Sequence, residues 1–187
     1  MLLGASFAVL ADTLPRTVAH AQGEVDEIDL AGATLLPRFI DVHIHGAAGI
    51  DVMDATVAGL LEVSEYLASQ GVTSWVPTFV PASDEHYARA IAVISEAMDG
   101  PGARVLGVHY EGPFVNTAQC GALHTEYFKT YSASADLDSL PLPSTGVRMI
   151  TIAPEVAGGV ALVRELKKRG WVISIGHTRA GLEGLDD

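Results

Sequence analysis

Hydrophobic and polar positions follow two different periods along this chain, and the two periods alternate. Apolar runs with the period of a strand fall near residues 38–45, 72–78, 104–111, 147–153 and 171–176. Apolar residues at helical spacing fall near residues 56–69, 83–98 and 156–169. Strands that alternate with helices are typical of right-handed βαβ units, so the sequence predicts an α/β fold with a parallel sheet.

The predicted helices carry recognisable signals at their ends. Ser83 precedes two acidic residues, which is typical of an N-cap and a first turn that complements the helix dipole. Gly71 stands where a C-terminal glycine is expected after the first helix. The face that this first helix buries is predicted to consist of Leu60, Leu61, Ser64, Leu67 and Ala68.

Two regions do not follow the alternation. Residues 1–36 contain short apolar pieces, with brief strands expected at 27–30 and 34–36, and we interpret them as part of a small β-sandwich module. The main domain is then expected over residues 37–187. Within it, residues 118–143 are irregular, and we expect this long segment to pass over the carboxyl ends of the strands.

Composition limits the possible partners and compartments. The 187 residues are 49% hydrophobic, and 11 Lys and Arg against 23 Asp and Glu give a formal charge of −12. This charge argues against nucleic acid and anionic membranes as partners. The apolar start, Leu2 to Ala11, lacks the basic region of a signal peptide, and no stretch reaches the length of a membrane span. Because Cys120 is the only cysteine, we expect a reducing, cytoplasmic location.

The first chemical signal is the pair His43 and His45 at the end of the strand near 38–45. Side chains two residues apart leave a strand on the same face, so the two imidazoles point the same way. Neutral imidazole suits zinc and similar divalent ions. Two strand histidines with ordinary hydrogen bonds are the alternative interpretation.

Two further side chains end later strands at the same edge of the predicted sheet. Glu111 ends the strand near 104–111, where a carboxylate can ligate one divalent ion or bridge two, or simply face solvent. His177 follows the strand near 171–176, although simple alternation leaves its direction open unless Gly176 bends the chain. His109 lies one layer deeper than Glu111 and is expected to support the ligands or to be a hydrogen-bonded core residue.

The other candidate residues carry weaker signals. Asp51 and Asp54 are expected to bond loop backbone, and His86 lies on a helix turn with no assigned role. Cys120 and His124 lie in the irregular segment, which could bring them over the site. Nothing in the sequence identifies a base that would activate Cys120 as a nucleophile.

Five groups of motif residues follow one another along the chain: Leu35 to Gly46, Gly71 to Ser74 with Pro77 and Thr78, His109 to Phe114, Ala153 to Glu155, and Gly176 to Thr178. In this order, they resemble the motifs of the N-acetylglucosamine-6-phosphate deacetylase family of the amidohydrolase superfamily. His-x-His alone indicates only the superfamily, whereas the remaining motifs narrow the resemblance to the deacetylase.

The resemblance implies a (β/α)8 barrel with a small β-sandwich, usually as a homodimer. It implies hydrolysis of the acetamide of N-acetylglucosamine 6-phosphate by a divalent metal, zinc being the ion we expect, in one or two copies. Glu111 and His177 match metal ligands, and His43 and His45 match the pair that holds a second metal. Ala122 matches a position that contacts the sugar through its backbone, and His124 is a second candidate for substrate contact.

The sequence departs from the family pattern in two respects. Arg38 stands where the family usually has glycine, which places a large cation at a strand start. A (β/α)8 barrel takes about 250 residues, and the five strands found here include neither the family's third metal-binding histidine nor its catalytic aspartate. We therefore expect a barrel truncated after about five strands, which when expressed alone aggregates or folds poorly and lacks activity.

Two alternatives stay open at this point. A dihydroorotase-like or aminoacylase-like amidohydrolase would share the His-x-His motif and the barrel. A truncated remnant that binds metal without turnover would share the ligands but not the activity.

Overall fold

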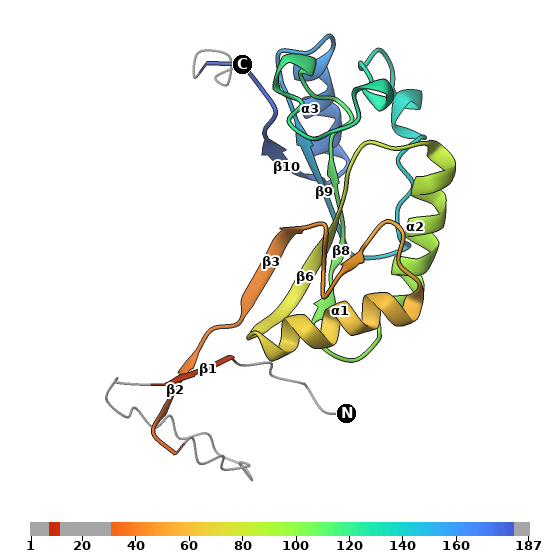
Figure 1. Ribbon diagram of the computed structural model, residues 1–187. Coiled ribbons are helices and arrows are strands. Elements are labelled where there is room, and N and C mark those ends of the chain that lie inside the picture. Colours follow the sequence, from red (N-terminus) through yellow and green to blue (C-terminus); the bar gives the residue numbers. More distant parts are fainter. Residues whose placement is uncertain (1–7, 12–30, 182–187) are drawn as a thin grey trace.

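The computed structural model describes residues 8–11 and 31–181 of the chain (Figure 1). Five parallel strands form the path of the main sheet in the order β10-β9-β8-β6-β3, with short β7 paired to β6. The strands of this sheet are β3 (Phe39–Ile44), β6 (Val72–Phe79), β7 (Arg104–Val105), β8 (Gly107–Glu111), β9 (Val147–Ile152) and β10 (Val172–Ile175). The predicted α/β class and parallel sheet are confirmed.

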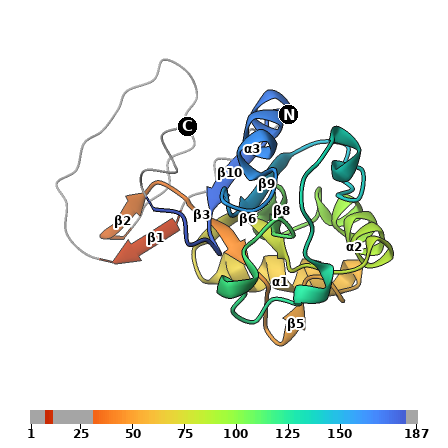
Figure 2. The same ribbon diagram turned by 90° about the horizontal axis from the view of Figure 1, so that it is seen from above.

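In the described part of the chain, three α-helices connect strands and cover one side of the sheet. They are α1 (Val57–Ser69), α2 (Asp84–Ala97) and α3 (Gly159–Lys168). Seen from above, the strands follow an arc with the helices on its outer side (Figure 2). This is the arrangement of part of a β/α barrel, in which the carboxyl ends of the strands share one rim.

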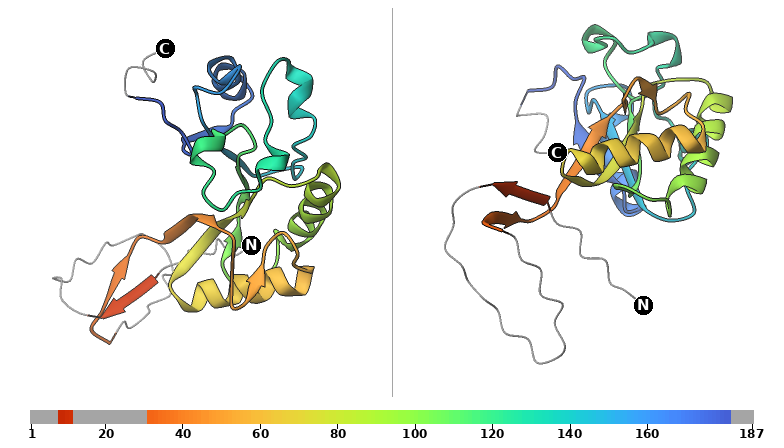
Figure 3. Two further views of the ribbon diagram at one scale, coloured as in Figure 1. Left: turned by 45° about the horizontal axis from the view of Figure 1, so that its top comes forward. Right: turned by 60° about the horizontal axis from the view of Figure 1, so that its bottom comes forward.

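The shorter elements lie outside the main sheet path. The antiparallel pair β1 (Ala8–Ala11) and β2 (Ala33–Leu36) lies apart from the sheet in both views of Figure 3. The strand expected at 34–36 is therefore present, whereas 27–30 lies outside the described residues. A hairpin of β4 (Gly46–Ala47) and β5 (Ile50–Asp51) follows β3, and the irregular segment contains the 3-10 turns η1 (Thr117–Gln119), η2 (Thr125–Tyr127) and η3 (Ser134–Leu137).

The expected helix caps are present, but one buried face differs from the prediction. The Ser83 hydroxyl accepts the His86 amide at 3.2 Å, and Gly71 follows α1 with a φ of 83°. The buried face of α1 consists of Leu60, Val63, Ser64 and Leu67, while Ala68 is exposed. The buried Trp75 side chain sets this face, because its Nε1 donates to the Ser64 hydroxyl at 3.0 Å.

Two predicted boundaries were wrong for reasons that involve glycine. The helix expected from residue 156 begins at Gly159, because Gly158 has a φ of 79° and cannot continue a right-handed helix. The strand expected at 104–111 is divided at Leu106. A side chain at Gly107 would bring its Cβ to 2.0 Å from the Val147 carbonyl oxygen, so β8 approaches β9 closely only because residue 107 is glycine.

The core fills the space between the sheet and the helices. Its largest fully buried side chains include Trp75, Phe79, Tyr87, Tyr110 and Phe114. By contrast, the two edge strands expose apolar side chains, with Val42 of β3 at 47% and Val172 of β10 at 51% exposure. Arg38 is exposed immediately before β3 and is not part of the core. Among the described residues, no helix is long and apolar enough to cross a membrane.

Candidate metal centre at the carboxyl ends of the strands

Three histidine side chains converge on the carboxylate of Glu111 at the end of β8. The Nε2 atom of His45 lies 3.1 Å from one carboxylate oxygen, and that of His177 lies 2.9 Å from the other. The Nε2 atom of His43 lies 3.7 Å from the oxygen that faces His177. Glu111 is thus placed between ligand candidates from β3 and a ligand candidate that follows β10.

The His43 and His45 side chains face the same way, as their spacing predicts. Their rings are 5.0 Å apart, and together with Glu111 they offer ligand atoms that all lie within 4.8 Å of one another. Strand β3 ends at Ile44, so His45 is the first residue beyond it and its carbonyl accepts the Val52 amide at 2.9 Å. The Asp41 carboxylate accepts the His43 amide at 3.1 Å, and between the two histidines the Ile44 amide donates to the Thr78 hydroxyl at 2.9 Å.

Backbone carbonyls determine which nitrogen of two histidines faces Glu111. Nδ1 of His45 lies 3.1 Å from the Thr78 carbonyl, and Nδ1 of His177 lies 2.7 Å from the Gln119 carbonyl. A carbonyl only accepts, so each Nδ1 carries a proton and Nε2 is the nitrogen that each ring turns toward Glu111. At this separation, either a proton on Nε2 or a bound cation can lie between a ring and the carboxylate, and Nε2 is the atom that a metal would take. The donor set therefore suits a divalent ion.

His177 reaches this centre because the chain turns after β10. The strand ends at Ile175, and His177 adopts a left-handed backbone with a φ of 50°, so strand alternation does not govern its direction. Such a conformation costs a residue other than glycine about 1–3 kcal/mol and has to be held by its surroundings. Burial acts to lower the pKa of His177, but the hydrogen bonds with Glu111 and the Gln119 carbonyl raise it.

His109 lies beneath the centre and is fully buried. Its Nδ1 donates to the Val42 carbonyl at 2.9 Å, and its Nε2 accepts the Thr151 hydroxyl at 2.8 Å. Burial lowers the pKa of His109 to about 4, which outweighs the opposing hydrogen bond to Val42, so the ring is neutral. Its ring is 5.1 Å from that of His43. His109 therefore joins β3 to β9 directly below the candidate ligands.

A second carboxylate, that of Glu155, holds the turn that carries His177. It accepts hydrogen bonds from the Thr178 hydroxyl, from the Arg179 amide at 2.6 Å and from the Asn116 side chain at 2.8 Å. Burial acts to raise the pKa of Glu155, but these hydrogen bonds lower it to about 2. The carboxylate is therefore ionised across the physiological range.

Several residues that shape the centre had no predicted role. Glu155 and Thr178 lie within motifs that carry the family resemblance, and this position in a motif is the signal that could have identified them. Thr78 and Gln119 act through their carbonyl groups, which any residue type provides. Thr78 lies in a motif of the resemblance as well, whereas Gln119 lies in no such motif and carries no side-chain signal.

Only part of the irregular segment 118–143 lies close to the candidate metal ligands among the described residues. Gly121 lies against the ring of His177, since a Cβ there would be 3.8 Å from its Cε1 atom. The neighbouring Ala122 is exposed, and Cys120 is a partly buried free thiol. The segment thus passes beside one candidate ligand, as the sequence predicts.

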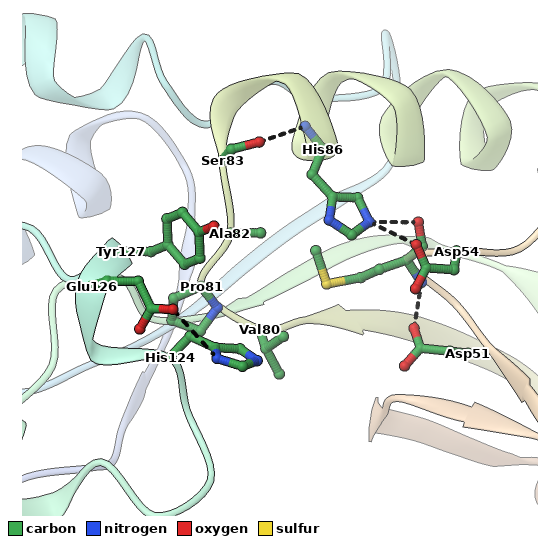
Figure 4. A pocket seen from close by; sticks show the side chains of 11 residues that line it. Asp51, Asp54, Val80, Pro81, Ala82, Ser83, His86, His124, Glu126 and Tyr127 are labelled. Carbon is green, nitrogen blue, oxygen red and sulfur yellow. Dashed lines mark hydrogen bonds and ion pairs between the residues drawn. The ribbon is translucent and has the colours of Figure 1, made fainter.

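His124 lies in a separate cleft of about 320 Å³ (Figure 4). Its ring faces Glu126 at 3.7 Å, and across the cleft Nε2 of His86 lies 3.1 Å from a carboxylate oxygen of Asp54. His86 is partly buried and also lies 3.1 Å from the Met53 carbonyl. None of the four candidate metal ligands is among the described residues that line this cleft.

Comparisons with known proteins point to one family, although no family model matches the chain. Human N-acetylglucosamine-6-phosphate deacetylase is 38% identical over 165 residues, which cover 85% of this chain and 40% of that protein. N-acetylgalactosamine-6-phosphate deacetylase from Escherichia coli O157:H7 is 37% identical over 149 residues, or 78% of this chain and 39% of that protein. A mutant of the Mycobacterium smegmatis N-acetyl-D-glucosamine-6-phosphate deacetylase, in complex with N-acetyl-D-glucosamine-6-phosphate, superposes with a TM-score of 0.72 at 29% identity. That match covers 96% of this chain and 45% of the solved chain.

The fold and the comparisons together define the class of protein. The parallel sheet with outer helices and the His and Glu side chains at its carboxyl rim are those of a metal-dependent amidohydrolase barrel. Within that class, the chain belongs to the N-acetylglucosamine-6-phosphate deacetylase family. It spans about 40% of the length of the curated relatives it matches.

Proposed function

We propose that this chain supplies metal ligands of an enzyme that hydrolyses the acetamide of N-acetylglucosamine 6-phosphate to glucosamine 6-phosphate and acetate. The observation that carries the proposal is the fixed orientation of His45 and His177, whose Nε2 atoms lie 3.1 and 2.9 Å from the two oxygens of Glu111. Three imidazoles and one carboxylate form a donor set that zinc favours.

In this proposal, Glu111 and His177 hold one divalent ion, and His43 and His45 hold a second where two are used. A bound divalent metal supplies an activated water at neutral pH and polarises the amide carbonyl. Glu111 keeps both oxygens available because it lies between the two sets of imidazoles. His45 and His177 keep their Nδ1 protons on backbone carbonyls, so neither ring turns away from the centre.

The proposal assigns the other tasks of catalysis as follows. Proton delivery to the leaving amine needs an acid, and we propose that it comes from a part of the relatives that this chain does not match. Ala122 and His124 are proposed to contact the sugar. The separate cleft around His124 is rich in carboxylates, which favours a contact with hydroxyl groups over one with the phosphate.

Further parts of the proposal concern the whole protein. We propose that residues 1–36 belong to a β-sandwich, that the protein works as a cytoplasmic homodimer, and that it acts in amino-sugar breakdown. The apolar side chains exposed on the edge strands β3 and β10 support a larger folded unit, because parallel strands are normally covered on both edges.

Metal binding and acetate release in the natural polypeptide that contains these residues test the proposal. We expect Glu111→Gln to weaken zinc binding at least 100-fold and to abolish acetate release, because it removes the charge that both ligand sets share. Glu165→Gln is the matched control, since that carboxylate pairs with Arg169 on α3 and lies outside both the centre and the cleft around His124. Wild-type zinc affinity and turnover in Glu111→Gln would show the proposal to be wrong.

The substrate is tested with a set of related amides. Acetate release is measured from the 6-phosphates of N-acetylglucosamine and N-acetylgalactosamine, from unphosphorylated N-acetylglucosamine and from an N-acetylated amino acid. We expect the highest kcat/KM for N-acetylglucosamine 6-phosphate. A preference for the amino acid would favour an aminoacylase-like amidohydrolase, and metal binding without any turnover would favour a non-catalytic protein.

A further inference from the structure

The carboxylate of Glu155 is bonded by donors from two separate segments of the chain. Glu155 follows β9, while Thr178 and Arg179 come from the turn after β10 and Asn116 comes from the loop after β8. One oxygen accepts both the Asn116 side chain and the Arg179 amide, and the other accepts the Thr178 hydroxyl. All three donors act on a group that takes no direct part in the candidate metal centre.

The turn after β10 needs such support. The sheet holds it only as far as Gly176, whose amide donates to the Ile152 carbonyl at 3.1 Å. The next residue, His177, has the left-handed backbone described above, and the chain then leaves the sheet. Thr178 extends the support, because its hydroxyl also accepts the Ala180 amide at 2.9 Å.

Asn116 connects the same carboxylate to the loop that orients the imidazole. The backbone amide of Asn116 donates to the His177 carbonyl at 3.0 Å, and its side-chain oxygen accepts the Ala118 backbone amide at 2.8 Å at the start of η1. That turn ends at Gln119, whose carbonyl accepts the Nδ1 proton of His177 at 2.7 Å. Glu155 is therefore hydrogen-bonded to two segments that determine how the His177 ring lies. One is the turn that carries His177, and the other is the loop whose Gln119 carbonyl accepts the Nδ1 proton.

We propose that Glu155 is a positioning residue, whose carboxylate fixes the 176–179 turn and the 116–119 loop so that His177 presents Nε2 to Glu111. This inference rests on the proposed metal centre for its consequence in catalysis. Its geometric part concerns the orientation of His177 in the protein itself. Loss of a residue that orients a metal ligand typically weakens metal binding 10- to 100-fold.

The first test measures metal binding with cobalt, which gives an absorption spectrum that depends on its ligands. In the natural polypeptide, we expect Glu155→Ala to weaken cobalt binding at least 10-fold and to change the d–d absorption bands. Glu155→Gln retains one acceptor oxygen and should show a smaller loss. Glu165→Ala is the matched control, since that carboxylate pairs with Arg169 on the exposed side of α3. Unchanged affinity and spectrum in Glu155→Ala would overturn the proposal.

The second test does not require a metal. Proton-detected nitrogen-15 NMR of the metal-free protein detects the Nδ1 proton of His177, and we expect this proton to exchange slowly with water because the Gln119 carbonyl accepts it. In Glu155→Ala, this protection should be lost, and the Arg179 amide should also exchange faster. A protein that binds no cobalt would refute the proposed function, whereas an Nδ1 proton that stays protected in Glu155→Ala would separately refute the positioning role.

Thr178 provides a second variant in case Glu155→Ala does not fold. Thr178→Val removes one of the three donors without changing the shape of the side chain, and we expect a 3- to 10-fold loss of cobalt affinity. Thr178→Ser keeps the hydroxyl and should restore binding. Equal affinity in the Val and Ser variants would contradict the proposal, and fluorescence of the buried Trp75 and Trp171 verifies folding in each case.

Discussion

Replacing His109 with leucine should destabilise the protein by removing the link between β3 and β9. The substitution leaves the Thr151 hydroxyl and the Val42 carbonyl without their partner. A buried polar group without a hydrogen bond costs about 1–3 kcal/mol, and water reaches the exposed edge strand more easily than the interior. We therefore expect the free energy of unfolding to fall by about 2–3 kcal/mol, most of it from Thr151, which is 5% exposed.

A double-mutant cycle separates this hydrogen bond from a general packing effect. Thr151→Val alone leaves Nε2 of His109 without a donor and should cost about 1–2 kcal/mol. The double variant contains neither the Thr151 hydroxyl nor Nε2 of His109, so its loss of stability should be smaller than the sum of the two single losses by about 1–2 kcal/mol. Urea denaturation followed by tryptophan fluorescence measures each corner of the cycle.

Strict additivity of the two substitutions would refute this reasoning. A coupling below about 0.5 kcal/mol lies within the usual scatter for independent sites, and it would mean that the 2.8 Å contact between His109 and Thr151 contributes nothing specific. A matched variant, His109→Gln, retains an amide that can donate to Val42 or accept from Thr151. We expect it to fall between the wild type and His109→Leu.

The remaining predictions concern acid stability, a glycine and the sheet edges. The pKa of Glu155 is about 2 in the folded protein and near 4.5 in the unfolded chain, so its ionised carboxylate stabilises the fold fully above pH 4.5 and progressively less as the pH falls toward 2. Glu155→Gln should therefore flatten the acid limb of a curve of unfolding free energy against pH. Gly158→Ala should lower the melting temperature by several degrees, because its Cβ would overlap the Tyr131 carbonyl and its φ is 79°; an unchanged melting temperature would contradict this. Lysine at Val42 and Val172 should reduce aggregation of the isolated 187 residues in light scattering, since both side chains are exposed on edge strands; unchanged aggregation would place its cause elsewhere.

The periodicity of the sequence predicted the elements well because it reports burial directly. The helix from Ser83 illustrates this, since the N-cap, the acidic first turn and buried Ile91 and Ile94 are all local features. The predicted ends of helices and strands were wrong where a segment distant in the sequence determined the local backbone geometry. The break before β8 depends on how closely Val147 of β9 approaches Gly107, and the apolar pattern over residues 104–111 contains no information about that approach.

In the candidate centre, too, some features followed from the sequence and others from contacts between distant segments. The sequence alone determined that His43 and His45 share a face, because strand alternation is a property of the backbone, and that Glu111 and His177 follow strands that end at the same rim. Only the tertiary structure decided the direction of His177, through its left-handed backbone and the network of Glu155. It also decided which imidazole nitrogen faces Glu111, because the Thr78 and Gln119 carbonyls that fix the protons come from other segments and can belong to any residue type.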